Sequence, residues 1–358
     1  MGLFYVLLLV PMVIQHVAIK GFHTDYEKRN KTAMAFFFFL LTVLVMFRHE
    51  SVGNDTRNYI YYFEKYSRMN WSQFSTESAE IAYLIFNKLI SLISRDPRFF
   101  LAAAAVTASA MLYPTYKRLC VDASLTILLF SVMSTFVMMF SGIRQMLAVG
   151  IGFVAYGFTR RRKPVLFALS VLLALLMHTS AFMLIFMYPL YHARITKKWL
   201  YAVVPALAVV FVFNRQIFSV LTALMAQYTR YEGGISSTGA YTMLMLFGIF
   251  AVFAFLIPDE SRLDGETIGL RNFLLFSLII QMFAPLHTLA MRMNYYYIIF
   301  IPLLLPKIIQ CRSKRWNQVA TLGRHVMVVV FLFYFFISAS RGGNLRVFPY
   351  HFFWENVG

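Results

Sequence analysis

The stretch that decides the fold is residues 164–191, PVLFALSVLLALLMHTSAFMLIFMYPLY. Its 28 residues include no Asp, Glu, Lys or Arg. An apolar helix of about 20 residues crosses the hydrocarbon core of a bilayer, so this stretch is too long for one straight span and short for two. We expect two short or broken helices that meet at His178-Thr179-Ser180 and together cross a membrane twice.

The whole chain has the same apolar character. Of its 358 residues, 60% are hydrophobic and 13% are charged, and the mean hydropathy is +0.66. Soluble domains are about 25% charged, so an ordinary cytosolic enzyme, a disulfide-stapled secreted domain and a disordered regulator are excluded. At roughly 20 residues per span, the length suits about ten to twelve spans. We expect an all-α integral membrane protein with one polytopic domain over residues 1–358.

Further apolar runs mark the other expected spans. They cover residues 2–19, 33–47, 99–116, 124–140, 143–158, 199–213, 241–257, 272–290, 295–309 and 326–337, with a shorter helix at 216–226. Residues 48–98 are the longest polar interruption, and we interpret them as an outer loop with an amphipathic or re-entrant helix at 80–94. Residues 226–239 are expected to form a second outer loop.

The basic residues indicate the orientation. The formal net charge is +18, which in a soluble protein would suggest nucleic acid, but multispanning proteins gather Lys and Arg in cytoplasmic loops. With residues 48–98 outside, the inner loops hold most of the 33 Lys and Arg. We therefore expect no nucleic-acid partner, and contact with anionic membrane lipids instead. Cys120 and Cys311 lie beside basic clusters, so we expect both on the cytoplasmic side. The sequence contains no CxxC motif, so neither a metal site nor a redox site is indicated.

Ionisable residues inside the apolar runs point to a site, because a charge at the bilayer centre costs at least ~3 kcal/mol. The spans contain almost no Asp or Glu, which weighs against ion-coupled transport. They do contain Arg144, His178, His287 and Arg292, which the predicted topology places in the outer half of the membrane. Each alone could be an interfacial anchor or a structural histidine. Together they favour a site for phosphate, which Arg binds through two donors.

The loop that starts at Gly53 adds a carboxylate beside aromatic rings. Asp55 follows Gly53-Asn54 and precedes five aromatic residues, which are Tyr59, Tyr61, Tyr62, Phe63 and Tyr66. Rings can cover the apolar face of a sugar while a carboxylate accepts from its hydroxyls. The alternative is an aromatic belt at the membrane interface.

Several short motifs together resemble a known family. In order they are Arg48, Gly53-Asn54-Asp55-Thr56 with Tyr59 and Phe63, Glu80 with Tyr83, Ile143-Arg144-Gln145, His178-Thr179-Ser180-Ala181, Arg292-Met293-Asn294-Tyr295-Tyr296 and Val347-Phe348-Pro349-Tyr350. Their order and spacing resemble the EpsG family, which is related to Wzy-type polysaccharide polymerases of O-antigen and exopolysaccharide. The resemblance runs from about residue 45 to the C-terminus, but residues 214–270 carry none of its motifs.

The resemblance implies an enzyme of the bacterial inner membrane that acts at the outer face. It would move a growing glycan from undecaprenyl pyrophosphate onto a sugar hydroxyl of the next lipid-linked repeat unit, by a glycosyl transfer that inverts the anomeric carbon. The general plan would be similar to lipid-dependent (GT-C-like) glycosyltransferases and O-antigen polymerases. A chain-length regulator in the membrane is a further partner of this kind of enzyme.

This chemistry gives each candidate residue a role. Arginines stabilise the charge that grows on the leaving pyrophosphate without a metal, and the acceptor hydroxyl needs a base. We predict Arg144 and Arg292 as the pyrophosphate clamp, and His178, or else Asp55, as the base. The expected substrate-binding residues are Arg57, Tyr59, Tyr62, Gln145, His287, Tyr295 and Tyr296. We expect no metal and no other cofactor.

Two other function classes stay open. A membrane O-acyltransferase also modifies glycans with intramembrane His and Arg, but its acyl donor would enter from the cytoplasm, away from the predicted outer site. A flippase for lipid-linked oligosaccharides needs a cationic central cavity and usually has paired halves. No internal repeat relates residues 1–180 to residues 181–358.

Overall fold

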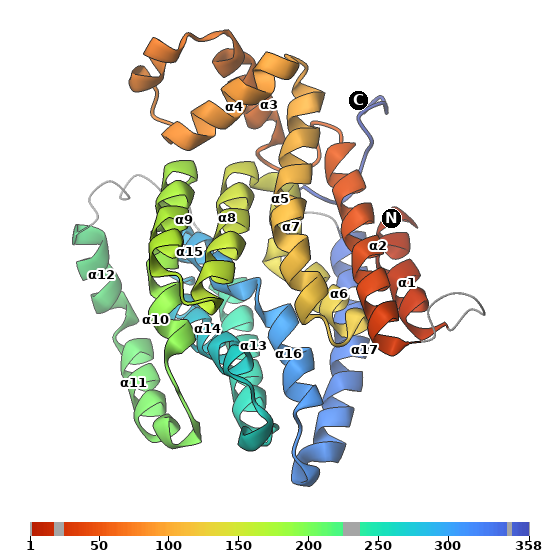
Figure 1. The fold of residues 1–358 in the computed structure, drawn as a ribbon, viewed down its shortest axis with the longest axis vertical. Helices are drawn as coiled ribbons and strands as arrows, with labels where there is room; N and C mark the ends of the chain where they lie inside the picture. The colour runs from red at the N-terminus through yellow and green to blue at the C-terminus, as the bar shows by residue number, and fades with distance from the viewer. Residues whose placement is uncertain (1, 18–24, 225–236, 342–345, 358) are drawn as a thin grey trace. The chain divides into compact units, whose positions relative to one another are not determined.

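The computed structural model describes residues 2–17, 25–224, 237–341 and 346–357, and its regular elements within these ranges are helices (Figure 1). The all-α class expected from the sequence is therefore confirmed. The chain divides into two compact units, residues 1–185 with 324–358 and residues 186–323. The prediction of a single membrane domain is not tested by this division. Of the expected outer loop at 226–239, residues 226–236 lie outside the described residues.

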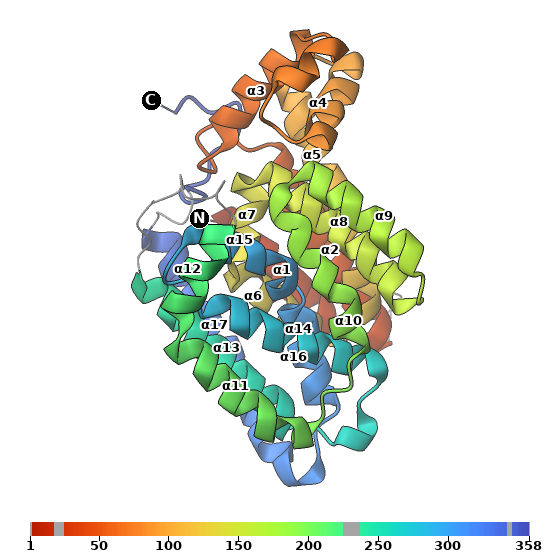
Figure 2. The same cartoon turned by 90° about the vertical axis from the view of Figure 1, so that its left-hand side faces the viewer.

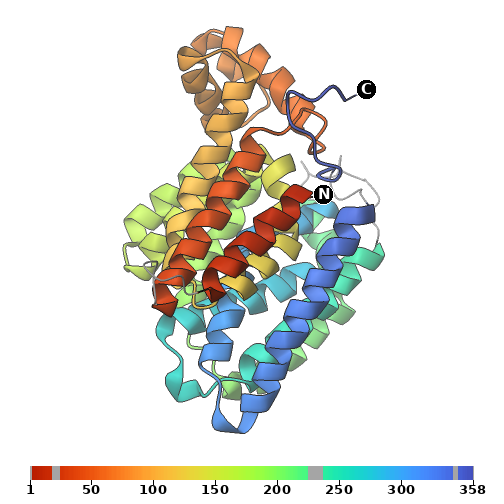
Figure 3. The same cartoon turned by 90° about the vertical axis from the view of Figure 1, so that its right-hand side faces the viewer.

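The first unit contains the following helices: α1 Gly2–His16, α2 Tyr26–Met46, α3 Thr56–Arg68, η1 Trp71–Thr76, α4 Ile81–Ile93, α5 Pro97–Leu119, α6 Ala123–Val132, α7 Ser134–Ser141, α8 Ile143–Arg160, α9 Pro164–Met177, nearly all of η2 Thr179–Phe186, and most of α17 Asn317–Arg341. The helices α1, α2, α5, α8 and α9 pack in that order, each against the next (Figure 3). Apolar side chains fill the space between them because helices in contact bury their facing residues.

An aromatic cluster closes the core of this unit. The Phe4 ring on α1 is fully buried and contacts Phe348 in the C-terminal tail, with 4.6 Å between ring centroids. It also meets Phe136 on α7 and Phe335 on α17, each edge to face. Edge-to-face ring pairs add stability beyond the area that they bury. The cluster therefore holds the first helix, the last helix and the tail together.

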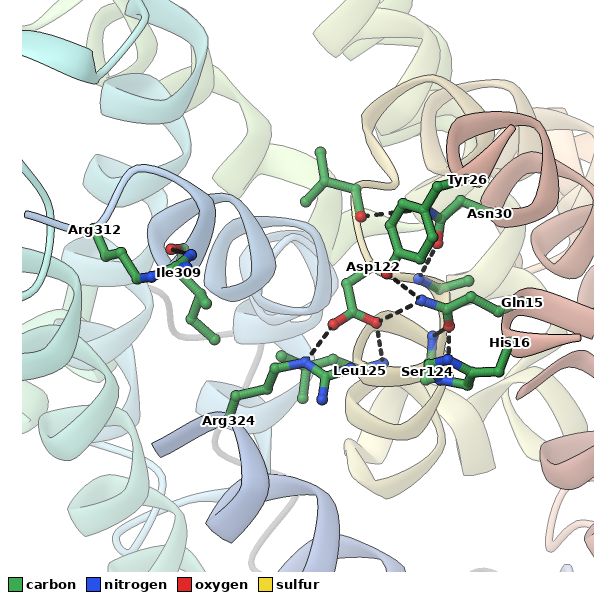
Figure 4. A network of polar contacts seen from close by, with 12 residues as sticks. Gln15, His16, Tyr26, Asn30, Asp122, Ser124, Leu125, Ile309, Arg312 and Arg324 are labelled. Carbon is green, nitrogen blue, oxygen red and sulfur yellow. Dashed lines mark hydrogen bonds and ion pairs between the residues drawn. The ribbon is translucent and has the colours of Figure 1, made fainter. Parts of the chain in front are cut away.

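A polar network ties the same helices at another point (Figure 4). Asp122, the N-cap of α6, accepts from Arg324 Nε on α17 at 2.7 Å and from Gln15 Nε2 on α1 at 3.1 Å. Gln15 Oε1 in turn accepts from the Ser124 backbone N–H. Buried polar groups must be paired to avoid a desolvation cost, and this network pairs them across three helices.

The segment between α2 and α5 folds as a helical cap on the first unit (Figures 1 and 2). The helices α3 and α4 pack on each other and on α5, and Phe63 stacks on Phe100 with 4.6 Å between centroids. Lys88 Nζ donates to the carbonyl oxygens of Ser67 and Met69 at 3.1 and 2.7 Å. The sequence predicted a helix at 80–94, where α4 lies, but not α3. That the segment lies outside the membrane stays a prediction.

The second unit is organised around a central helix. It contains α10 Met187–His192, η3 Lys197–Trp199, α11 Leu200–Val212, α12 Asn214–Leu224, α13 Ser237–Leu256, η5 Glu260–Arg262, α14 Gly265–Gln281, α15 Thr288–Ile298, α16 Ile301–Gln310, η6 Lys314–Trp316 and the start of α17. The central helix α14 packs against α10, α13, α15 and α16. Its Arg271 is fully buried and donates twice to Glu260, at 2.6 and 3.2 Å.

The polytopic membrane architecture is confirmed, and within the described residues four to seven candidate spans meet the length and composition expected of a membrane helix. Four helices within the described ranges are long and apolar enough to cross a membrane: Tyr26–Met46, Pro97–Leu119, Gly239–Leu256 and Lys314–Arg341. Three bent helix pairs raise the number to seven if each pair is one span. The expectation of ten to twelve spans counted apolar runs, whereas several of those runs are broken into short helices.

Three apolar runs expected to be single helices are broken. The 124–140 run bends by 64° at Met133, whose backbone is extended (φ −77°, ψ 150°) between α6 and α7. The 272–290 run ends as a helix at Gln281, and Pro285 follows in the link to α15. The 295–309 run bends by 45° between α15 and α16. Proline cannot donate to a helix and favours the second and third breaks, near Pro285 and Pro302, whereas the 124–140 run contains no proline.

Candidate functional site

The Glu80 carboxylate joins three segments of the first unit. Its Oε2 accepts from Arg144 Nη1 at 2.8 Å, and its Oε1 accepts from His178 Nδ1 and from the Thr179 backbone N–H, both at 3.1 Å. The Glu80 side chain is 13% exposed. Glu80 precedes α4, Arg144 lies in the first turn of α8, and His178 ends α9. Residues separated by up to 99 positions in sequence therefore meet at one carboxylate.

The helix ends explain why these groups need one another. The positive end of the α8 dipole disfavours a cation in its first turn, so Arg144 needs a nearby anion. At the end of α9, His178 has an extended backbone (φ −161°, ψ 123°), which places the next N–H, that of Thr179, outside the helix ladder. Such an N–H needs another acceptor. Glu80 supplies both the negative charge and the acceptor.

The Glu80 carboxylate determines that Nδ1 of the His178 ring carries a proton. Burial raises the pKa of Glu80, but the hydrogen bond from His178 and the charge of Arg144 outweigh it and lower this pKa to about 2. An ionised carboxylate only accepts hydrogen bonds, so Nδ1 of His178 carries a proton. When the imidazole is neutral, its Nε2 has the free lone pair. This is the arrangement by which a carboxylate orients a histidine base.

Four tyrosines form a wall beside this cluster, and we call Tyr59, Tyr62, Tyr66 and Tyr83 the tyrosine wall. The Tyr83 ring lies 5.5 Å from Arg144 Cζ and meets Tyr59 and Tyr66 edge to face, at 6.2 and 6.4 Å between centroids. Tyr62 stacks on Tyr66 at 5.7 Å and is 42% exposed. Burial raises the pKa of Tyr66 to about 12, so its hydroxyl stays protonated at neutral pH.

The loop before α3 is held in place by the end of α7. Thr56 Oγ1 donates to the carbonyl oxygen of Val52 at 2.7 Å and lies 3.3 Å from that of Phe140. Gly53 has φ +88°, and a Cβ there would collide with the carbonyl oxygen of Phe140. Only glycine adopts this conformation without strain. Because Phe140 is four residues before Arg144, the loop and the Arg144 turn are fixed to the same backbone.

The C-terminal tail holds the other side of this loop. The Gly53 N–H donates to the carbonyl oxygen of Arg346 at 3.0 Å, and the His49 N–H donates to that of His351 at 2.8 Å. Tyr350 Oη donates to the carbonyl oxygen of Leu44 at 2.8 Å. The motif Val347-Phe348-Pro349-Tyr350 therefore anchors the tail against the segment that leads to α3.

The comparisons with known proteins give one decisive match. The chain matches the EpsG family over residues 31–352, most of its length. It belongs to the EpsG family. Neither the curated proteins nor the solved structures contain a match. Membership implies a role in exopolysaccharide biosynthesis for this multi-pass membrane protein, and the resemblance inferred from the motifs is confirmed.

The structure brings several predicted site residues of this EpsG-family chain together. Arg144 and His178 share the Glu80 carboxylate, and Tyr59 and Tyr62 belong to the tyrosine wall. Gln145, next to Arg144, is buried on α8. The roles predicted for these residues remain predictions.

Two predicted residues lie on the approach to α3. Asp55 is the N-cap residue of α3 without a side-chain capping bond, and its charge acts on Tyr59. Arg57 forms a surface ion pair with Glu50, with 3.3 Å between Nε and Oε1, and its side chain is 67% exposed. Exposed pairs of this kind contribute little to stability, so Arg57 is held only weakly by Glu50.

The remaining predicted residues belong to the second unit. His287 is the N-cap of α15, where its Nδ1 accepts from the Leu289 backbone N–H at 3.0 Å. Arg292 is exposed on α15, whereas Tyr295 and Tyr296 are buried, at 6% and 1%. A clamp that combines Arg144 with Arg292 stays a prediction.

Sequence reasoning gave no role to Glu80 or Tyr83, and Tyr66 was named among the possible sugar-binding rings but not among the expected substrate-binding residues. Glu80 and Tyr83 were part of the family resemblance, but neither was assigned to the site. A usable signal was present, because a chain with 33 Lys and Arg and 15 Asp and Glu needs counter-charges for the cations in its apolar runs. Glu80, directly before an apolar helix, was a candidate for that counter-charge.

Proposed function

We propose that this EpsG-family protein is a polysaccharide polymerase. It transfers a growing glycan from undecaprenyl pyrophosphate onto a sugar hydroxyl of the next lipid-linked repeat unit. The observation that carries this proposal is the Glu80 carboxylate, which holds a guanidinium and an imidazole at one place beside the tyrosine wall. Glycosyl transfer from a pyrophosphate requires a cation for the leaving group and a base for the acceptor.

Arg144 would serve the leaving group. The anomeric carbon–oxygen bond breaks, and its electron pair goes to the pyrophosphate oxygen. Arg144 uses Nη1 toward Glu80, and a guanidinium has five N–H donors in all. Arg144 also makes a side-chain hydrogen bond with Tyr59, and its side chain is 34% exposed, so the donors that remain can reach an incoming anion. Donors aimed at the growing negative charge stabilise the transition state.

His178 would serve the acceptor. A new bond forms between the acceptor oxygen and the anomeric carbon, and the hydroxyl proton moves to His178 Nε2. This single displacement inverts the anomeric configuration. Both Glu80 oxygens are already occupied, so Glu80 is a positioning residue that orients the imidazole and balances its charge after the proton arrives. This favours His178 over Asp55 as the base.

The tyrosine wall would bind the sugars. Aromatic rings pack against the C–H faces of sugar rings, and phenol hydroxyls hydrogen-bond to sugar hydroxyls. Tyr62 is the most exposed ring of the wall. Tyr59 hydrogen-bonds to the Arg144 side chain, and the Tyr83 ring lies 5.5 Å from Arg144 Cζ. A glycan laid along the wall would run from solvent toward the reacting groups. We place this site on the outer face of the bacterial inner membrane, where the predicted topology puts residues 48–98.

The test uses the host that makes the glycan. Arg144→Lys, His178→Ala and Glu80→Gln are each expected to abolish long surface chains while single repeat units still reach the outer face. Arg98→Lys and Glu77→Gln are matched controls. Arg98 lies in the first turn of α5 and packs over the ring of Phe353. Glu77 pairs with Lys65 at 2.7 Å. Both controls should keep normal chains. Repeat units trapped on the cytoplasmic side would indicate a flippase, and normal chains that lack acyl groups would indicate an acyltransferase.

A further inference from the structure

A basic recess lies in the second unit and shares no residue with the groups proposed for glycosyl transfer. Its volume is about 350 Å³, within the range of small-ligand sites. Its lining consists of Arg262, Gln310, Arg312, Ser313, Lys314 and Asn317. Three of these six residues are cationic and none is acidic. We call this set the basic recess.

Backbone contacts between two loops build the recess. The link after α13 pairs with the link after α16, through an antiparallel bridge between Pro258 and Arg312. The Asp259 N–H donates to the carbonyl oxygen of Cys311 at 2.9 Å, and the Ser313 N–H donates to that of Ile257 at 3.0 Å. Main-chain hydrogen bonds therefore hold the two loops that form the recess together.

Side-chain contacts then fix two of the cations. Arg262 Nη1 donates to the carbonyl oxygen of Arg312 at 3.2 Å. Arg312 donates through Nε to Asn317 Oδ1 at 2.5 Å and through Nη1 to the carbonyl oxygen of Ile309 at 3.1 Å. These acceptors are neutral, so they orient the guanidinium groups without cancelling their charge. A pre-oriented guanidinium loses less entropy when it binds an anion.

The charge of one nearby carboxylate, Asp259, acts on Arg262, while Glu260 pairs with a residue outside the lining. Asp259 Oδ1 accepts from the backbone N–H and the hydroxyl of Ser261, at 3.1 and 2.8 Å. Glu260 accepts two bonds from the buried Arg271. The N-terminus of the 25-residue α17, at Asn317, adds partial positive charge to the recess. The recess therefore presents net positive charge to a ligand.

The recess lies between the end of one candidate span and the start of the next, which is the depth of phosphate groups in a membrane. Gln310 ends the bent pair α15–α16, and Lys314 begins the candidate span that contains α17. Headgroups border the hydrocarbon core at the ends of spans. Arg315 Cζ lies 5.2 Å from the Trp316 ring, and tryptophan is enriched at that interface. The positive-inside bias places these loops on the cytoplasmic side.

We propose that the basic recess binds a phosphate group, carried by an anionic phospholipid or present as free phosphate. Arg312 and Arg262 would bind phosphate oxygens through paired N–H donors, and Lys314 would act as a point charge. The proposal does not depend on the glycosyl transfer, because the recess shares no residue with the cluster around Glu80.

Binding to the purified full-length protein in detergent tests the proposal. The probes are dioctanoyl phosphatidylglycerol, dioctanoyl phosphatidylcholine and inorganic phosphate, each measured by isothermal titration calorimetry. We expect wild type to prefer phosphatidylglycerol over phosphatidylcholine. Lys314→Gln should weaken phosphatidylglycerol binding by about tenfold, the size of one lost bond to a charged group, and Arg312→Gln with Lys314→Gln should weaken it further. Arg315→Gln is the matched control, because it removes one charge from the same loop outside the lining.

The outcomes separate the two sources of phosphate. If millimolar inorganic phosphate displaces phosphatidylglycerol, the recess takes free phosphate, and if it does not, the recess takes the lipid headgroup. Either result supports the proposal when Lys314→Gln binds weakly. The proposal is overturned if Arg315→Gln weakens binding as much as Lys314→Gln, or if wild type binds phosphatidylglycerol no better than phosphatidylcholine. Surface-glycan length reports separately on glycosyl transfer, so the two proposals can fail independently.

Discussion

Glu80 Oε1 lies 3.1 Å from Nδ1 of His178, which stands 98 residues later in the chain. The same carboxylate accepts from Arg144 through its other oxygen. One acidic side chain therefore sets both the direction of the imidazole and the position of the guanidinium. The roles proposed for Arg144 and His178 depend on this shared partner, and most of the predictions below start from it.

Glu80→Gln should lower polymerisation strongly while the protein stays folded. The amide keeps the size of the side chain but loses the charge, and it cannot accept at both ends from Arg144, His178 and Thr179. Since a well-placed general base contributes about 10²- to 10⁴-fold, we expect a loss of at least roughly tenfold in chain elongation. The measurement is elongation rate with purified protein, and Glu77→Gln is the control. A Glu80→Gln variant with the wild-type rate would refute a positioning role.

The stability contributed by Glu80 should depend on pH. Its pKa in the folded protein is about 2, below the ordinary value of 4.5, so the contribution is fully present above pH 4.5 and is lost as the pH falls toward 2. The shift corresponds to about 3 kcal/mol of unfolding free energy. Thermal unfolding in detergent should show wild type more stable than Glu80→Gln at pH 7, with the difference shrinking below pH 4.5. A difference that stays constant from pH 7 to pH 3 would contradict this account.

Asp122→Asn should destabilise the first unit without a direct effect on the site. The change removes the charge that pairs with Arg324 at 2.7 Å, where the Asp122 side chain is only 13% exposed. Loss of a partly buried charged hydrogen bond costs about 1–3 kcal/mol. The melting temperature of the purified protein should fall. Asp25→Asn is the control, since Asp25 caps α2 at an exposed position. Equal melting temperatures for the two variants would show that the network in Figure 4 adds no stability.

Gly53→Ala should disturb the loop that leads to the tyrosine wall. Gly53 has φ +88°, and the added methyl group would collide with the carbonyl oxygen of Phe140. The strain should cost more than about 1 kcal/mol of unfolding free energy and should reduce elongation as well. Gly157→Ala on α8 is the control, because a Cβ there meets no atom within 4 Å. If both alanine variants melt and elongate alike, the loop does not need this glycine.

The sequence predicted the class of the protein and the helix break at His178. Hydropathy revealed an apolar stretch of unsuitable length for one span, and the structure breaks it at His178, between α9 and η2. The breaks at Met133 and between Gln281 and Thr288 were not predicted. The first occurs inside a run without proline or charge, where composition carries no signal. The second contains Pro285, a signal that a count of apolar residues does not use.

The site was predicted in part. Arg144 and His178 stood out because ionisable groups in apolar runs are costly. Glu80 did not stand out, because it lies in a polar loop where a carboxylate needs no explanation, and only the folded chain brings it to the two cations. Partnership between distant residues cannot be deduced from local spacing. The need for a counter-charge could be deduced, but its position required the structure.

The most direct test of the central claim is a reaction with purified protein and one lipid-linked repeat unit. The readouts are the length of the glycan on a gel and the amount of undecaprenyl pyrophosphate released. We predict that wild type forms oligomers and releases one undecaprenyl pyrophosphate for each new bond, and that Arg144→Lys and His178→Ala form neither product. Oligomers of wild-type length from these two variants, or wild-type protein that forms no bond under conditions where the repeat unit is bound, would contradict the account.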